Sequence, residues 1–539
     1  MKRSATLLMA MAALSLTASA QSAIDAYTLS RSDLRGTARF MSMGGAFTAL
    51  GGDISTLTQN PGGLGLYRSS EINATLDLNF QSSKTATPSA DIKNTQTKVA
   101  CNEFGYVGSF YTGNEVMPYF NVGFSYGRAA SFDRAYKASF GQLQGSLSNY
   151  IAAMTSMQPS GASGYSPEDL TDAYTDYNPY TDSNAPWLSI LGYNAFMINP
   201  VTGNANYSGL WQNGTSGSGA VDVVEKGYID EYNIDLGGNL YNTVYWGLGV
   251  GITDLSYTSS KYYEEDFNNA AIAKGPDVDG TTTGDGGFGL DNYKHMWGNG
   301  FNFKIGLIVK PINELRIGLA VHTPTYYNLS IQNWAGVDYG YSTVGSGETQ
   351  TNRSFYETVD WKLRTPWRLM AGVAGVIGSK GIVSLDYEYR PNQSINMRDY
   401  NGYEMTTLNG DIKSYYKATN IIRLGLEYRI SPMFSARAGY VYESQPVTTE
   451  FSHNELPVYT SGYYDYGTDP SYTVDKTRQY FTLGLGVRGK SCYFDVAYVG
   501  MKNDSEFHAY TPNSITAAAP SASIKNFDNH LVMTLGFRF

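Results

Sequence analysis

The sequence predicts an all-β protein: a fourteen-stranded antiparallel transmembrane β-barrel whose lumen is plugged by an N-terminal hatch. Three observations lead to this fold class. Only 16% of the 539 residues are charged, whereas the 58 Gly and 45 Tyr exceed the usual composition. Apolar and polar residues alternate with a period of two through much of the chain. The connections between the alternating segments are short and long in turn, which is typical of outer-membrane barrels.

The first element, residues 1–20, is interpreted as a secretory signal peptide. A basic start and an apolar stretch lead to the small residues Ala18 to Ala20, a pattern typical of a cleavage site. Further along, the most apolar stretch is 369–377, about half the length that a spanning helix needs. A membrane location therefore requires strands.

Residues 21–70 form the second element, which does not alternate and is rich in Gly and other small residues. Short helical turns are expected at 46–50 and 54–58, the latter with Asp53 as N-cap. Fourteen strands enclose more room than their own side chains fill. We therefore predict that this segment is a hatch in the lumen; the alternative is a periplasmic tail beneath the barrel.

Residues 71–539 form the predicted barrel. In 419–430, for example, Leu424 shares one face with other apolar residues, while Arg423 and Gly425 share the opposite face. Most segments reach the roughly nine to eleven residues that a tilted strand needs to cross a bilayer. The predicted strands are 71–81, 103–112, 119–128, 227–240, 243–257, 300–310, 314–323, 366–377, 381–391, 419–430, 433–443, 478–488, 491–501 and 529–539.

The long connections are expected to be extracellular loops, of which 129–226 is the largest, and the short ones periplasmic turns. In hydrocarbon every backbone polar group must be paired, so the sheet must close. An even number of strands is expected to leave both ends of the mature chain on the periplasmic side. Within the largest loop, 142–157 and 186–197 are predicted helices whose apolar residues either form a ligand-binding surface or pack on one another.

The hatch carries a resemblance to a known family. The run from Arg35-Gly36 through 43–47, Gly52-Asp53 and 60–64 resembles the hatch of the FadL family of outer-membrane transporters for long-chain fatty acids and other hydrophobic compounds. That family includes TodX-like aromatic-hydrocarbon channels and relatives often called hemin receptors. It has Asn-Pro-Ala where this chain has Asn60-Pro61-Gly62. The segments 300–325 and 364–366 are similar to barrel segments of the same family.

The resemblance implies passive uptake of hydrophobic small molecules across the bacterial outer membrane. Ligand would be captured by extracellular loops, pass the hatch and leave sideways into the bilayer near the third strand. Gly123 and Gly127 are the lateral-gate candidates, because glycine in a strand often marks a bulge; the alternative is ordinary barrel curvature. The ligand-path candidates in the hatch are Phe40, Met41, Met43, Phe47, Asn60, Pro61 and Gly62.

The C-terminal Phe539 closes an alternating strand and resembles the signal read by the bacterial barrel-assembly machinery. The other expected partners are the hydrophobic ligand and outer-membrane lipid, with the chain a monomer. The net charge of -10 offers no face for nucleic acid.

Other function classes find less support in the sequence. We expect no enzyme, no cofactor and no metal. Two alternatives remain, a surface adhesin anchored by a barrel and a haem-uptake receptor. The lumen carboxylates are expected to be salt-bridged filling and not an acid/base pair: Asp386, Glu388, Glu427 and Asp495 opposite Arg316, Arg423 and Arg437.

Overall fold

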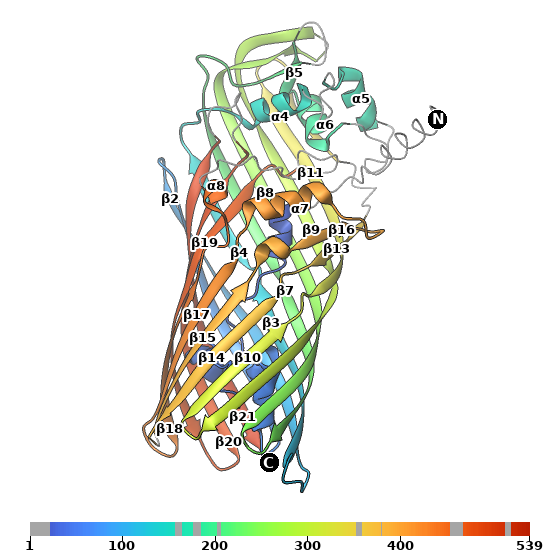
Figure 1. Ribbon diagram of the computed structural model, residues 1–539. Coiled ribbons are helices and arrows are strands. Elements are labelled where there is room, and N and C mark those ends of the chain that lie inside the picture. The colour runs from blue at the N-terminus through green and yellow to red at the C-terminus, as the bar shows by residue number, and fades with distance from the viewer. Residues whose placement is uncertain are drawn as a thin grey trace, which may run out of the picture.

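The computed structural model contains a closed antiparallel barrel of fourteen strands (Figure 1). It describes residues 22–156, 164–175, 185–201, 206–276, 278–351, 358–378, 380–452, 467–511 and 519–539; the predicted signal peptide lies outside these residues. The barrel strands are β1 (Glu71–Ala86), β2 (Asp91–Tyr111), β3 (Tyr119–Ser131), β7 (Ser216–Leu240), β8 (Val244–Gly275), β9 (Val278–Ile312), β10 (Leu315–His322), β14 (Arg368–Ile377), β15 (Gly381–Arg390), β17 (Thr419–Arg429), β18 (Phe434–Glu443), β19 (Tyr472–Arg488), β20 (Cys492–His508) and β21 (Ser521–Arg538).

Each barrel strand pairs with the next, and β21 pairs with β1 to close the sheet. Beyond the last strand, Phe539 and Ser70 exchange backbone hydrogen bonds of 3.0 and 3.1 Å. All fourteen predicted strands are present. The sequence was therefore sufficient to predict the strand number and the order of pairing.

The expected long loops are largely wrong, because many strands continue beyond the membrane. The predicted loop 258–299 is mostly a hairpin of β8 and β9, and 82–102 is mostly a hairpin of β1 and β2. Strand pairing also satisfies backbone hydrogen bonds outside the bilayer, so strands need not end at its surface. The remaining strands are β4 (Arg134–Phe140), β5 (Ile198–Pro200), β6 (Tyr207–Gly209), β11 (Tyr326–Tyr341), β12 (Gly345–Gln350), β13 (Val359–Arg364) and β16 (Asn396–Asp399).

The helices outside the hatch segment lie at the long-loop end, at the top of Figure 1. They are α4 (Leu147–Ser156), α5 (Pro167–Thr175), α6 (Trp187–Asn194), α7 (Thr406–Tyr415), α8 (Thr449–Ser452) and the 3₁₀ turn η4 (Asn392–Ser394). The predicted helices in the largest loop are α4 and α6. Their apolar side chains, such as Ile151 and Leu191, are buried in a shared cluster with β7, β8 and β9, so they do not form an open surface. In the described part of the chain no helix has the length and apolarity to cross a membrane.

The outer surface of the barrel carries an apolar belt. Leu424 is 37% exposed, whereas Arg423 beside it is 8% exposed and faces the lumen, as the alternation predicts. Other belt residues are Leu248, Ile252, Phe301, Leu319, Leu385, Phe481, Leu483 and Leu535. An exposed apolar band over a polar lumen is the arrangement required of a barrel in lipid.

The segment before β1 runs through the lumen and contains α2 (Ala23–Thr28), α3 (Ala38–Ser42) and the 3₁₀ turns η1 (Ile54–Thr58) and η2 (Pro61–Leu66). We call residues 22–70 the hatch. Asp53 caps η1 as expected, whereas 46–50 forms only turns. The hatch packs against strands from most of the barrel circumference, which is why so many of its residues are fully buried.

One expectation about the chain ends is wrong. The C-terminus lies at the short-turn end, but α2 lies towards the long-loop end, where Tyr27 stacks on Tyr416 at 4.6 Å and Asp25 pairs with Lys294 at 3.0 Å. An even strand number fixes only where β1 begins and β21 ends. The hatch must descend the lumen to reach Glu71, so the described chain begins near the opposite end.

Candidate functional site

The hatch packs against glycines of the barrel wall. A Cβ atom at Gly425 would lie 2.7 Å from the Met43 carbonyl oxygen, and one at Gly123 would lie 2.9 Å from the Leu57 side chain. Because glycine has no side chain, the hatch backbone approaches the sheet closely. The same contact is made by Gly105, Gly247, Gly306, Gly318, Gly372, Gly439 and Gly484. In the sequence, these contact positions are marked by strands in which large apolar residues alternate with lumen-facing glycines.

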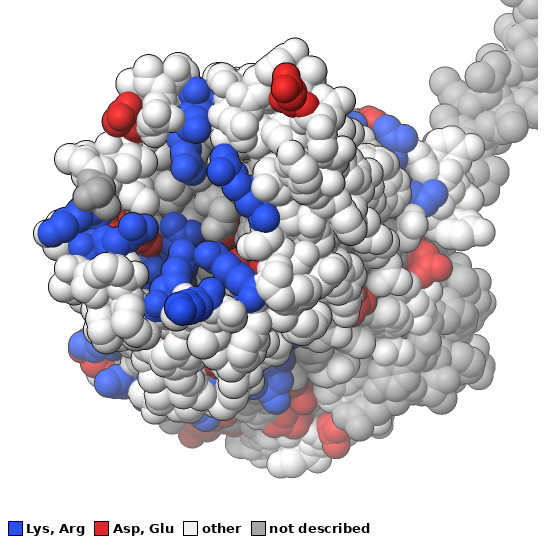
Figure 2. Space-filling model, turned by 90° about the horizontal axis from the view of Figure 1, so that it is seen from below, with Lys and Arg blue, Asp and Glu red and all other residues white. Residues whose placement is uncertain are grey.

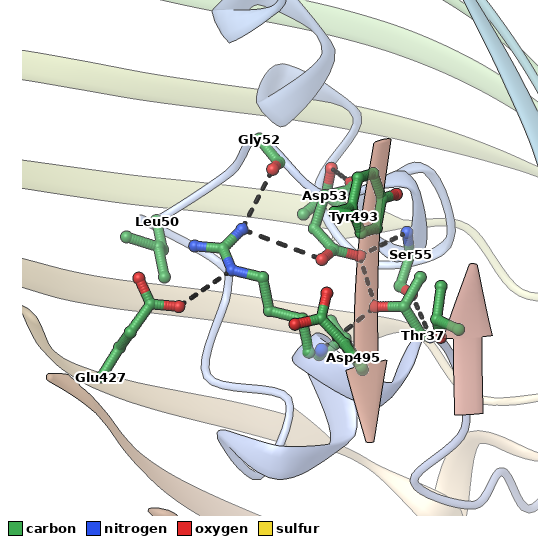
Figure 3. Close-up of polar contacts among 12 residues, drawn as sticks. Thr37, Leu50, Gly52, Asp53, Ser55, Glu427, Tyr493 and Asp495 are labelled. Carbon is green, nitrogen blue, oxygen red and sulfur yellow. Dashed lines mark hydrogen bonds and ion pairs between the residues drawn. The ribbon is translucent and has the colours of Figure 1, made fainter. Parts of the chain in front are cut away.

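Arg39 of α3 joins the hatch to the wall (Figure 3). Its Nε donates to Glu427 of β17 at 3.1 Å, and its Nη1 donates to the Gly52 carbonyl at 3.1 Å and lies 3.8 Å from Asp53. Asp53 also accepts a hydrogen bond of 2.8 Å from Thr37. This network ties two turns of the hatch to each other and to the barrel.

The Asn60-Pro61-Gly62 turn holds the lower hatch. Asn60 caps η2, since its side-chain oxygen accepts from the Gly62 amide at 2.9 Å, and its Nδ2 donates to the Thr48 carbonyl at 2.5 Å. Pro61 and Gly62 lie directly against Gly247 and Gly306. The turn is therefore a structural contact between the hatch and the β8–β9 wall.

The four large apolar candidates of the hatch, Phe40, Met41, Met43 and Phe47, are all buried in one cluster. The rings of Phe40 and Phe47 are 5.2 Å apart. Met41 accepts a hydrogen bond of 3.2 Å from Asn102 of β2 at its sulfur. Among these candidates, Phe40 also lines the cavity described next.

A cavity of about 80 Å³ lies between the upper hatch and the wall. Its apolar lining comes from Leu34 and Phe40 of the hatch and from Ile421 and Val441 of the wall, and Gly127 of β3 also lines it. At about 10–15 Å³ per water, this space holds roughly five to eight waters or one end of a larger ligand. A ligand of lipid size would require the hatch to shift.

Three arginines gather on one wall of the cavity, which is also lined by the acidic residues Asp33, Glu103, Glu231 and Glu443. Glu388 of β15 is fully buried and pairs with three guanidinium groups, those of Arg368 at 2.7 Å, Arg423 at 2.6 Å and Arg390 at 2.5 Å. All three arginines line the cavity. Arg423 Nη1 is buried with no hydrogen-bond partner within the described part of the chain. The arrangement leaves donor capacity for an additional anionic group.

The barrel wall parts beside this cavity. Pairing of β2 with β3 ends at Glu103 and Gly127, although both strands continue. Asn102 of β2 is the extra residue of a bulge opposite β1, and the β3 register against β7 shifts between Arg128 and Ala130. Gly127 is thus at the point of separation, whereas Gly123 lies lower, beneath Leu57.

The remaining charged candidates have structural partners. Glu427 and Asp495 pair with Arg437 at 2.6 and 2.5 Å, as the sequence suggested. Asp386 instead accepts from the Thr48 amide of the hatch at 2.7 Å, and Arg316 donates to the Leu50 carbonyl at 2.5 Å. Sequence reasoning missed the roles of Arg368 and Arg39, because their partners come from other elements, and of Arg390, which pairs with Glu388 two residues before it on the same face of β15. Within the described ranges no three His, Cys, Asp or Glu side chains are grouped for a metal ion.

A closed fourteen-stranded barrel with an apolar belt and a plugged lumen belongs to the class of outer-membrane channel folds. The crystal structure of a Pseudomonas aeruginosa FadL homologue is similar over 95% of this chain and 100% of that chain, with a TM-score of 0.51 and 11% identity. The toluene transporter TodX of P. putida is similar over 94% of this chain and 99% of that chain, with 12% identity and a TM-score of 0.47. The toluene transporter TbuX of Ralstonia pickettii is similar over 95% of this chain and 100% of that chain, with 14% identity and a TM-score of 0.46. No family model and no curated protein matches the sequence. The first similarity shows the fold.

Proposed function

We propose that the protein is a bacterial outer-membrane channel for passive uptake of hydrophobic small molecules with an acidic head group, such as long-chain fatty acids. The observation that carries this proposal is the cavity beside the hatch. It places apolar side chains next to three arginines that share one carboxylate. An apolar chain and a carboxylate head are the two chemical features that this lining complements.

The proposed path has three steps. Ligand is captured at the extracellular end, including the 129–226 region, and enters the cavity when the hatch moves. It then leaves between β2 and β3, where pairing ends at Gly127. Lateral exit is favourable for an apolar chain, because passage into lipid avoids resolvating it at roughly 0.8 kcal/mol per CH₂.

Binding of palmitate and of hexadecanol to the purified protein tests this function. Arg423→Gln removes a donor facing the cavity, and Glu388 keeps Arg368 and Arg390 as partners. We expect palmitate affinity to fall about tenfold, the worth of one charge-assisted hydrogen bond, while hexadecanol binding is unchanged. Lys137→Gln, which removes a charge from an exposed ion pair, is the matched control.

Absence of saturable binding for both compounds would contradict the proposal. An equal loss for palmitate and hexadecanol in Arg423→Gln would contradict the head-group site. An adhesin would bind neither compound in the lumen, and a haem receptor would bind haem in preference to both.

A further inference from the structure

The short-turn mouth of the barrel is strongly basic. Figure 2 looks onto this end and shows Lys and Arg gathered around a central hollow, with few Asp and Glu among them. The chain as a whole carries a net charge of -10, so the positive charge of this mouth is opposite in sign to that of the chain. The arginines that face the lumen here are Arg39, Arg316, Arg429, Arg437, Arg488 and Arg538.

Half of these arginines have carboxylate partners. Glu427 pairs with Arg39 and Arg437, and Glu71 pairs with Arg538 at 2.7 Å. Asp495 also pairs with Arg437, and these carboxylates together neutralise the positive charge of Arg39, Arg437 and Arg538.

The other three arginines, Arg316, Arg429 and Arg488, have no ion pair with any residue that the structure describes. Arg316 uses Nη1 for the Leu50 carbonyl, and its Nε is buried without a partner. The guanidinium of Arg488 lies 5.6 Å from the centre of the Tyr493 ring. Arg488 also lies within electrostatic range of Arg39 and Arg538 and of the carboxylates Asp495 and Glu427, which themselves pair with Arg437.

The register places Arg429 and Arg488 on the two sides of Ser435 at the rim, beside the Arg437–Asp495 pair that lies over Gly486. Arg429 of β17 pairs with Ser435 of β18, which pairs in turn with Gly486 of β19, two residues before Arg488. β17 and β19 lie on the two sides of β18 and are about 10 Å apart. The two arginine side chains can therefore reach one ligand above Ser435, whose side chain is small. The half-buried position of Arg488 inside the mouth raises the strength of such a contact, because water screens it less than at an open surface.

We propose that this mouth is a binding site for a soluble anion with phosphate or carboxylate groups, held between Arg429 and Arg488. Guanidinium groups bind both kinds of oxyanion through paired N–H donors. The lumen-facing position favours a soluble ligand over a lipid head group, because lipid meets the outer surface of the barrel. Arg316, near Arg39 across the mouth, adds to the positive potential without a carboxylate of its own.

Calorimetric titration at low ionic strength tests this site, with pyrophosphate and citrate as probes and acetate as a monovalent comparison. The protein is used in an uncharged detergent. We expect pyrophosphate and citrate to bind, and Arg429→Gln/Arg488→Gln to weaken binding at least tenfold. The control Lys93→Gln/Lys525→Gln removes two charges from exposed positions at the opposite end and should leave the affinity unchanged.

Heat-modifiable migration in electrophoresis checks that each variant is a folded barrel. If the double variant does not fold, Arg429→Gln alone serves, because that side chain is exposed at the rim. Equal affinity in wild type and the arginine variants, or an equal loss in the control, would overturn the proposal. So would variants that lose association only with phosphatidylglycerol nanodiscs while binding pyrophosphate normally, since the occupant would then be lipid.

Discussion

Arg39 of the hatch donates a hydrogen bond of 3.1 Å to Glu427 of β17, which lies 388 residues further along the chain. Both side chains are nearly buried, and the bond belongs to one of five ion pairs between the hatch and the wall in the described residues. It connects the segment that must move in the proposed uptake path to the part of the barrel that cannot.

Replacing Arg39 by Gln should loosen the hatch and leave the barrel folded. Glu427 keeps Arg437 as partner, so the expected loss is about 2 kcal/mol in the free energy of hatch displacement. Conductance in planar bilayers and protease cleavage of the hatch should both increase. Lys84→Gln, which breaks an exposed pair with Asp91, should change neither.

A disulfide between the hatch and the gate should stop uptake. A Cβ at Gly127 would lie 3.8 Å from Thr58 Cγ2, which stands near the position that a cysteine sulfur would take, so a disulfide in Thr58→Cys/Gly127→Cys requires only a small shift of the two residues. The exposed native Cys101 and Cys492 are first replaced by Ser. We expect palmitate uptake by cells to be lost and then restored by reductant, while each single cysteine variant transports normally. Full uptake by the oxidised protein would exclude hatch movement at this point.

A charge on the lipid face should destabilise the barrel. Leu424→Arg places a cation among the belt residues and should cost about 2–4 kcal/mol in the free energy of unfolding in liposomes. Leu424→Met keeps the surface apolar and should cost little. Gly425→Ser would be no neutral lumen control, because its side chain would collide with the Met43 carbonyl. Similar stabilities for the two Leu424 variants would contradict the assigned orientation of β17.

The helices at the long-loop end should respond to pH through Glu265, which lies on β8 beyond the apolar belt. It accepts hydrogen bonds from Ser146 at 2.6 Å and from the Leu147 amide at 3.1 Å, and burial raises its pKa to about 7. The pKa of Glu265 in the folded protein exceeds that of an unfolded Glu. The packing of the α4 region against Glu265 therefore loses stability as pH rises from about 4.5 to about 7, by up to about 3 kcal/mol. The hydrogen-exchange protection of Leu147 should therefore fall between pH 5 and pH 8. Glu265→Gln should remove most of this pH dependence. An unchanged dependence of Leu147 protection on pH in that variant would contradict the role of Glu265.

The C-terminal Phe539 should matter for assembly more than for stability. Its backbone pairs with Ser70, but its ring is 72% exposed and contributes little packing. Phe539→Gln should thus lower the amount of heat-modifiable barrel in the outer membrane, as expected if the assembly machinery reads the residue. Urea unfolding of the barrel that does form should match wild type. A normal yield in cells would argue against the signal.

The strands and their faces follow from the sequence because alternation is local. Leu424 and Arg423 point to opposite sides whatever the rest of the chain does, and lipid demands that the apolar side face outward. The same local reasoning gave Asp53 as the cap of η1 and the Asn60-Pro61-Gly62 turn. It could not locate the strand ends, since pairing beyond the membrane depends on the partner strand.

What only the tertiary structure decided is the set of contacts across the lumen. The sequence alone determined a barrel of fourteen strands, the lipid-facing residues and a compact segment before β1. It did not determine that Arg368, Arg390 and Arg423 share Glu388, because these residues come from β14, β15 and β17 and meet through the barrel register. Nor could it place α2 near the long-loop end, since the path of the hatch depends on which wall glycines its backbone can approach. Alternation is a property of neighbouring residues, whereas closure of the sheet brings together residues that are hundreds of positions apart.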